Sequence, residues 1–200
     1  LNRKIVDSPF AESLRQLNEG NEIYLRGLKG AVEIFREENI PLQSELATLA
    51  QEYSSVQGNM SIEWDGQTIT LQQASNILMQ TDRQKREQVW HLMQKRRAED
   101  TDKLNELFNK MVQLRHQLAV NAGFNNFRDY MFKAMGRYDY DVDACKDFHR
   151  SVETAVVPML KSLMLDRKEK MGLESLKPWD TAVDPLGREP LKPFTGGDQL

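Results

Sequence analysis

The sequence predicts an all-α protein of mainly long antiparallel helices, with one short β-hairpin at about residues 60–71. Apolar residues recur at helical spacing through most of the first 172 residues, and only 7 prolines interrupt the 200-residue chain. Between residues 58 and 71 the apolar period falls from about 3.6 to about 2, which is typical of strands. We therefore expect a helical domain over residues 1–172, followed by an irregular proline- and glycine-rich segment over 173–200.

The composition is that of a globular protein. Hydrophobic residues make up 40% of the chain and charged residues 28%, which is typical of a chain with a packed core. The net charge is -3, and the basic residues of 83–97 are flanked by acidic ones, so no nucleic acid is expected as a partner. No apolar run is long enough to span a bilayer, so no membrane association is expected. The single cysteine, Cys145, excludes an internal disulfide and favours a reducing compartment, the cytoplasm.

The N-terminal residues predict two amphipathic helices. Ser8 and Pro9 suit the N-cap and the first position of a helix that extends to about Phe35, and the glycines over 27–30 allow a break there. A second helix is expected to begin near Pro41 and to continue to about residue 56. We expect the apolar stripe of each helix to face the core.

The hairpin is predicted by its turn. Asp65-Gly66 is a typical two-residue type I′ turn, because both central residues of that turn need positive φ. The turn sets three cross-strand pairs, namely Trp64 with Gln67, Ile62 with Ile69, and Met60 with Leu71. These pairs place the apolar side chains on one face of the hairpin. Thr70 can then cap a short helix that extends to about residue 79.

The remaining regular structure is predicted as three helices. Thr81 and Asp82 begin a very long helix that ends at Gly123, and a short helix over about 127–135 follows. The last long helix extends from about residue 141 to residue 172, and Pro158 is expected to kink it. Its apolar stripe, which is expected to face the core, consists of Cys145, Phe148, Val152, Ala155, Met159 and Leu163.

The sequence offers few residues for catalysis. No His-Glu-x-x-His motif occurs in the chain, and the three histidines, His91, His116 and His149, lie far apart in the sequence. We therefore expect no catalytic residue and no metal ligand among these 200 residues. One candidate for binding remains at the corner between two helices, where Arg137, Tyr138 and Tyr140 could face a substrate channel and hold a peptide backbone. The alternative is a polar corner that only ties the helices together.

Several motifs, in order along the chain, match one family. The longest is the run NAGFNNFRDYMFKAMGRYDY over 121–140. The others are Ile40-Pro41 with Gln51-Glu52-Tyr53, the hairpin, Thr81-Asp82-Arg83 with Arg86-Glu87, Pro158, and Leu176 with Pro178-Trp179-Asp180. Over about residues 30–195 the chain resembles the N-terminal half of an oligoendopeptidase F-type enzyme, a relative of thimet oligopeptidase.

This resemblance implies a zinc endopeptidase that cleaves short, unstructured peptides. In that family two histidines of a His-Glu-x-x-His helix and a glutamate of a later helix hold the zinc, and here all of them would lie beyond Leu200. The chain would then form one wall of a peptide channel, with short peptides and the C-terminal catalytic half of the same protein as partners. Zinc is expected as the cofactor of the parent protein. The chain alone is expected to bind no zinc and to hydrolyse no peptide.

A second interpretation stays open, in which the chain is a self-standing helical module that binds a peptide or protein without catalysis. The chain begins at Leu1 rather than at a methionine, and Asp198 would cap a helix for which no residues follow before Leu200. These two observations favour the interpretation that the chain is a piece of a longer enzyme over the interpretation that it is a self-standing module.

Overall fold

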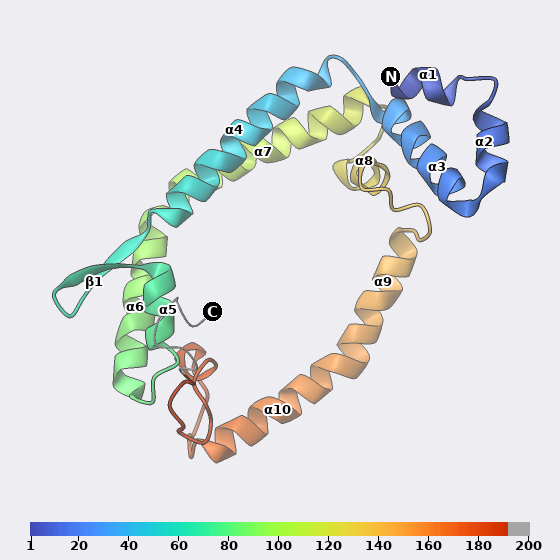
Figure 1. The fold of residues 1–200 in the computed structure, drawn as a ribbon. Helices are drawn as coiled ribbons and strands as arrows, with labels where there is room; N and C mark the ends of the chain where they lie inside the picture. The colour runs from blue at the N-terminus through green and yellow to red at the C-terminus, as the bar shows by residue number, and fades with distance from the viewer. Residues whose placement is uncertain (192–200) are drawn as a thin grey trace, which may run out of the picture. The chain divides into compact units, whose positions relative to one another are not determined.

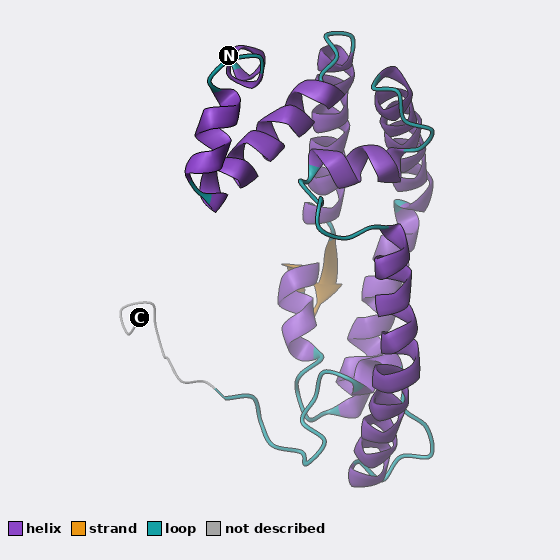
Figure 2. Cartoon of the chain, turned by 90° about the vertical axis from the view of Figure 1, so that its right-hand side faces the viewer, coloured by secondary structure: helices purple, strands orange, loops and turns teal. Residues whose placement is uncertain are grey.

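The computed structural model describes residues 1–191, and these residues form helices with one two-stranded antiparallel hairpin (Figure 1). The predicted fold class is therefore confirmed. Figure 2 shows the two strands in orange among helices and their connecting loops. The chain divides into two compact units, Leu1–Tyr53 with Asn105–Asp147 and Ser54–Leu104 with Phe148–Leu200. The predicted domain boundary after residue 172 stays a prediction.

The first unit begins with three helices where one was expected. They are α1 (Asn2–Val6), α2 (Ala11–Leu17) and α3 (Glu19–Ile34). The break that the glycines over 27–30 allow does not occur, because α3 is continuous there. The chain breaks instead at Asn18, whose backbone is extended with φ -167° and whose side chain accepts a hydrogen bond from the backbone N–H of Asn21 at 2.9 Å. Asn18 thus caps a new helix rather than continuing the old one.

Parts of three helices and one whole short helix complete the first unit. The unit contains the first part of α4 (Asn39–Gly58), most of α7 (Thr101–Asn121), all of α8 (Phe127–Ala134) and the first part of α9 (Val142–Ser151). Helix α7 stops at Asn121, just before the predicted terminating glycine Gly123, which has φ +87°, and the N–H of Phe124 donates to the carbonyl of Ala119 at 2.9 Å. This closure brings the start of α8 onto the end of α7. The core there contains Ala119, Ala122 and Tyr130, with Ile34, Phe124, Phe127 and Met131 packed around them.

A buried asparagine joins the two long helices of this unit. Asn39, at the start of α4, is 2% exposed. Its Nδ2 donates to the carbonyl of Leu118 at 3.0 Å, and its Oδ1 accepts from Nδ2 of Asn121 at 2.8 Å. The side chain therefore satisfies two polar groups of α7 in a place where water has little access.

Replacing Asn39 with alanine should destabilise the first unit. The substitution leaves the Leu118 carbonyl and the Asn121 amide without their partner, and we expect a loss of about 1–3 kcal/mol in the free energy of unfolding. Urea unfolding followed by circular dichroism measures this change. Gln43→Ala, on an exposed turn of the same helix, is the control and should change stability by less than about 0.5 kcal/mol. Equal effects of the two substitutions would contradict a structural role for Asn39.

The hairpin of the second unit has the predicted register. Strands β1 (Ser61–Trp64) and β2 (Gln67–Thr70) pair Ile62 with Ile69 and Trp64 with Gln67. Asp65 and Gly66 have φ values of 53° and 76°, as a type I′ turn requires. The hairpin leads directly into α5 (Leu71–Ile77), which begins with a capping box between Thr70 and Gln73.

The predicted long helix after Asp82 is in fact two helices. Asp82 caps α6 (Arg83–Glu99) as expected, by accepting from the backbone N–H groups of Gln84 and Lys85. The chain then leaves helical geometry at Asp100, which has φ -100° and ψ 8°, and α7 begins at the next residue. The carboxylate of Asp100 accepts from Arg96 at 2.6 Å, so its side chain is turned back onto α6. The core of this part contains Ile62, Ala74, Val89 and Met93.

The last long helix is interrupted next to Pro158. It consists of α9 (Val142–Ser151), a π-helical turn η1 (Val152–Val156) and α10 (Val157–Lys170). Pro158 has no amide hydrogen to donate to the carbonyl of Thr154, and the backbone widens into a π-turn just before it. The prediction that its apolar stripe faces the core is wrong for Phe148, Met159 and Leu163, which are 68%, 57% and 51% exposed.

The chain then continues into an irregular segment with one 3₁₀ turn, η2 (Pro178–Asp180). This turn carries two buried residues, Trp179 and Asp180, and packs on α6. None of the helices in the described part of the chain is long and apolar enough to cross a membrane.

Candidate functional site

The predicted corner lies between α8 and α9 in the first unit. Asn126 caps α8 by accepting from the N–H of Asp129 at 3.0 Å, and hydrogen bonds from Arg128 and Asn126 lower the pKa of the Asp129 carboxyl. At the other end Gly136 has φ +65°, and the N–H of Arg137 donates to the carbonyl of Phe132 at 2.9 Å. Both ends of the short helix are therefore fixed, and the residues after Gly136 leave it in a defined direction.

The structure places the three predicted corner residues in two groups. The guanidinium of Arg137 lies 5.4 Å from the ring centre of Phe132, and the ring of Tyr140 meets the same Phe132 edge-on at 5.9 Å. Tyr138 turns instead toward α3, where the guanidinium of Arg26 lies 5.2 Å from its ring centre. The tyrosine hydroxyl donates to the carbonyl of Lys133 at 3.4 Å. Their expected role in a substrate channel stays a prediction.

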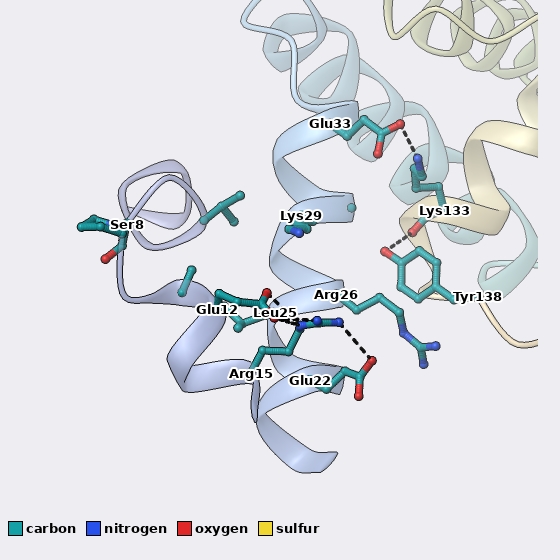
Figure 3. A pocket seen from close by; sticks show the side chains of 14 residues that line it. Ser8, Glu12, Arg15, Glu22, Leu25, Arg26, Lys29, Glu33, Lys133 and Tyr138 are labelled. Atoms are coloured by element: carbon teal, nitrogen blue, oxygen red, sulfur yellow. Dashed lines mark hydrogen bonds and ion pairs between the residues drawn. The ribbon is translucent and has the colours of Figure 1, made fainter. Parts of the chain in front are cut away.

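Tyr138 lines a cavity of about 580 Å³ in the first unit (Figure 3). The cavity is bounded by the segment from α1 to α2, one side of α3 and the end of α8. Its lining residues are Val6, Ser8, Pro9, Ala11, Glu12, Arg15, Glu22, Leu25, Arg26, Lys29, Gly30, Glu33, Lys133 and Tyr138. Sequence reasoning identified Tyr138 and missed the others, because they come from three separate segments and form no motif.

The cavity wall is charged, and most of its charges are paired. Arg15 contacts both Glu12, at 2.6 Å, and Glu22, at 3.8 Å, and Lys133 pairs with Glu33 (Figure 3). Hydrogen bonds from Arg15 and Gln16 lower the pKa of the Glu12 carboxyl. The lining contains neither histidine nor cysteine. The cavity therefore offers charges and hydrogen-bond donors for binding, without a nucleophile and base arranged for catalysis.

A buried ionic cluster lies in the second unit. Asp180 is fully buried, and its carboxylate accepts from Arg83 at 2.9 Å, from Arg86 at 3.1 Å and from the N–H of Lys177 at 3.0 Å. Arg86 is 2% exposed and also donates to the carbonyl of Trp179 at 2.9 Å. Burial alone would raise the pKa of Asp180, but these hydrogen bonds prevail and hold it below the usual value.

The cluster joins two motifs that lie far apart in the sequence. The segment Thr81-Asp82-Arg83 with Arg86 and the segment Pro178-Trp179-Asp180 are far apart along the chain, and the structure joins them through one carboxylate. Two further donors of Arg86 reach the carbonyls of Gln80 and Thr81, at 2.9 and 2.8 Å. Because Nε, Nη1 and Nη2 of Arg86 all donate to protein groups, the cluster is a structural connection between α6 and η2.

The described residues do not fit a zinc centre. Within residues 1–191 no three side chains of His, Cys, Asp or Glu lie together so that they could hold a metal ion. His91 packs against aromatic rings, with its centroid 5.0 Å from that of Trp90 and 5.3 Å from that of Trp179.

Comparison with known families gives the class of this protein. The model of peptidase family M3 matches residues 77–195, which is more than half of the chain. The chain belongs to peptidase family M3. The matched segment contains both halves of the buried ionic cluster and the whole corner from α8 to α9.

Solved structures with the same fold include oligoendopeptidases and a related peptidase. A protein described as an oligoendopeptidase F from Bacillus anthracis str. Ames superimposes with a TM-score of 0.84 and 20% identity, over 91% of this chain and 33% of its own. A second oligoendopeptidase F and PZ peptidase A with an inhibitor each give a TM-score of 0.87 and 24% identity, over 92% of this chain and 33% of theirs. The chain thus spans about a third of the length of these proteins. Comparison with curated proteins gives no match.

Proposed function

We propose that this chain is the N-terminal, channel-wall lobe of a zinc-dependent oligoendopeptidase that hydrolyses short peptides. The observation that carries the proposal is the family match over residues 77–195. The fold shared with oligoendopeptidase F over 91% of the chain supports it. In this proposal the helical lobe comprises residues 1–172, and the segment after it leads toward the catalytic part of the polypeptide.

The lobe contributes contacts to the peptide rather than the reaction itself. Tyr138 presents its ring and hydroxyl beside a charged cavity, and Arg137 and Tyr140 present a cation and an aromatic ring next to it in sequence. Such groups hold a peptide backbone by hydrogen bonds and by stacking, and an extended peptide offers a carbonyl and an amide for them at each residue. The zinc and its ligands belong, in this proposal, to polypeptide outside these 200 residues.

The proposal is tested by comparing the 200-residue chain with the whole polypeptide of the parent protein. Zinc content is measured by mass spectrometry, and cleavage is measured with a quenched fluorescent peptide of about ten residues. We expect chelator-sensitive cleavage by the whole polypeptide and neither zinc nor cleavage in the chain alone. Stoichiometric zinc together with chelator-sensitive cleavage in the purified chain alone would refute the proposal.

A non-catalytic binding module is the second candidate, and the charged cavity of about 580 Å³ favours it. Fluorescence polarisation with labelled short peptides distinguishes the two. If the chain is a binding module, the 200-residue chain alone should bind peptides as tightly as the whole polypeptide does. If the chain is one lobe of a peptidase, its peptide affinity should be much weaker than that of the whole polypeptide, because the catalytic part supplies the remaining contacts.

A further inference from the structure

The helix α10 carries an apolar face that is exposed in the second unit. Residues Val156, Met159, Leu160 and Leu163 follow the spacing i, i+3, i+4, i+7, which places them on one side of a helix. Val157 and Met164 lie beside this row, one position further around the helix. We call these residues the α10 face, which consists of Val156, the last residue of η1, and of Val157, Met159, Leu160, Leu163 and Met164 of α10.

The exposure of the α10 face is unusual for side chains of this size. Its residues are between 36% and 57% exposed, and no residue of α10 is buried within the described part of the chain. Each large apolar side chain gains about 1.5–3 kcal/mol when it is fully buried, so a contiguous row of six is typical of an interface. The helix is held at its end, where Nε of Arg167 donates to the carbonyl of Asp180 at 2.9 Å. Its apolar face is left for another surface.

A row of basic side chains runs beside the α10 face. Lys161 and Lys168 are seven residues apart, so they lie on the same side of the helix, next to Val157 and Met164. Neither lysine has an ion-pair partner among residues 1–191, whereas Lys170, near the end of the helix, pairs with Asp166 at 2.7 Å. The surface that covers the face therefore has a definite character: an apolar centre with acidic groups along one edge.

We propose that the α10 face docks onto the remaining, catalytic part of the M3 peptidase polypeptide, through an apolar surface with an acidic edge. This inference rests on the proposed function. The solved relatives have about two thirds of their length outside the matched region, since the match covers 33% of each. That length supplies a partner of domain size, covalently linked and thus at high effective concentration.

Other occupants explain the face less well. The nine residues 192–200 contain only Pro193, Phe194 and Leu200 as large apolar residues, too few to cover the six of the face. A second copy in a two-fold antiparallel pair would set the row of Lys161 and Lys168 against the same row of its partner, and like charges repel. The catalytic part of the polypeptide can place acidic side chains opposite Lys161 and Lys168, and it then avoids this repulsion between like charges.

The test compares hydrogen exchange of α10 in the 200-residue chain and in the whole polypeptide. We expect the amides of residues 157–165 to exchange at least about tenfold more slowly in the whole polypeptide. The double substitution Leu160→Glu with Leu163→Glu should abolish this difference. Leu165→Gln is the control, because Leu165 lies outside the α10 face, is 59% exposed, and an uncharged side chain there forms no ion pair with Lys161 or Lys168. It should keep the difference.

A second pair of substitutions tests the charged edge without touching the apolar row. Lys161→Glu with Lys168→Glu should reduce the protection in the whole polypeptide about tenfold and leave the helical content of the chain unchanged. Equal exchange of wild-type α10 in both proteins would overturn the proposal. So would a 200-residue chain that sediments as a dimer and becomes a monomer on Leu160→Glu, because the occupant would then be a second copy.

Peptide cleavage by the wild-type whole polypeptide is measured in the same samples. An active peptidase without added protection of α10 refutes the docking surface and leaves the proposed function intact. Protection of α10 in a polypeptide without peptidase activity refutes the proposed function instead, because the docking partner would then not be a catalytic part.

Discussion

Replacing Asp180 with alanine is expected to destabilise the second unit by about 3–5 kcal/mol. The substitution leaves the guanidinium of Arg86, which is 2% exposed, without the carboxylate that neutralises it. It also removes the bidentate partner of Arg83 and an acceptor of the Lys177 N–H. A buried charge without a partner is far more costly than the loss of an exposed ion pair. Urea unfolding at neutral pH measures the effect.

Asp166→Ala is the control for this prediction. Asp166 pairs with Lys170 at 2.7 Å on an exposed turn of α10, and its loss should change the free energy of unfolding by less than about 0.5 kcal/mol. Restoring an uncharged core with Arg86→Met in the Asp180→Ala background should recover part of the lost stability. A change below about 1 kcal/mol for Asp180→Ala would show that the cluster is not the connection described above.

The same carboxylate predicts how stability depends on pH. The pKa of Asp180 is lowered in the folded protein, so the unfolded state binds the proton more readily. The stabilisation is therefore complete above the pKa of an unfolded aspartate, about 3.9, and is lost as the pH falls through the lower folded value. Urea midpoints measured between about pH 6 and pH 2 should fall more steeply for the wild type than for Asp180→Asn.

Replacing Gly30 with alanine should destabilise the first unit by about 1–3 kcal/mol. A Cβ at this buried position would meet the hydroxyl oxygen of Tyr138 and would lie 2.9 Å from its Cζ. Because carbon atoms pack at about 3.5–4.0 Å, the ring of Tyr138 would have to shift away from α3. Thermal unfolding followed by circular dichroism measures the change.

Gly27→Ala on the same helix is the matched control. No atom lies within 4 Å of a Cβ added at Gly27, so alanine there should stabilise α3 by about 0.5–1 kcal/mol through its higher helix propensity. The cost of Gly30→Ala should fall sharply in a Tyr138→Ala background, since the clash is then gone. If the two glycine substitutions had the same sign and size, the close packing of Tyr138 on α3 would be disproved.

Local features of the fold were predictable from the sequence. The register of the hairpin follows from Asp65 and Gly66 alone, because a two-residue turn fixes every pair behind it. The end of α7 follows from Gly123 in the same way. The breaks at Asn18 and Asp100 were missed, because these residue types occur both inside helices and as caps, and only the surrounding packing decides between the two.

Less of the candidate site could be predicted from the sequence. Nothing in the segments around Arg86 and Asp180 indicates that these charged side chains are buried, and only the fold shows that they share one buried hydrogen-bond network. Tyr138 was singled out, but the glycine on which it packs lies more than a hundred residues earlier in the sequence. The stripe through Met159 and Leu163 predicted a helix face buried in this chain, but both side chains are exposed. Apolar periodicity indicates that a helix face makes contacts, and it does not identify the surface that the face contacts.

Each of the two units is assembled from two stretches of sequence, and the chain passes between them near residues 53, 104 and 147. All three passages fall inside helices, namely α4, α7 and α9. In genetic terms, neither the first half nor the second half of this coding sequence specifies a unit that folds alone. An exchange of sequence with a relative would preserve an intact unit only when crossovers occur in matched sets.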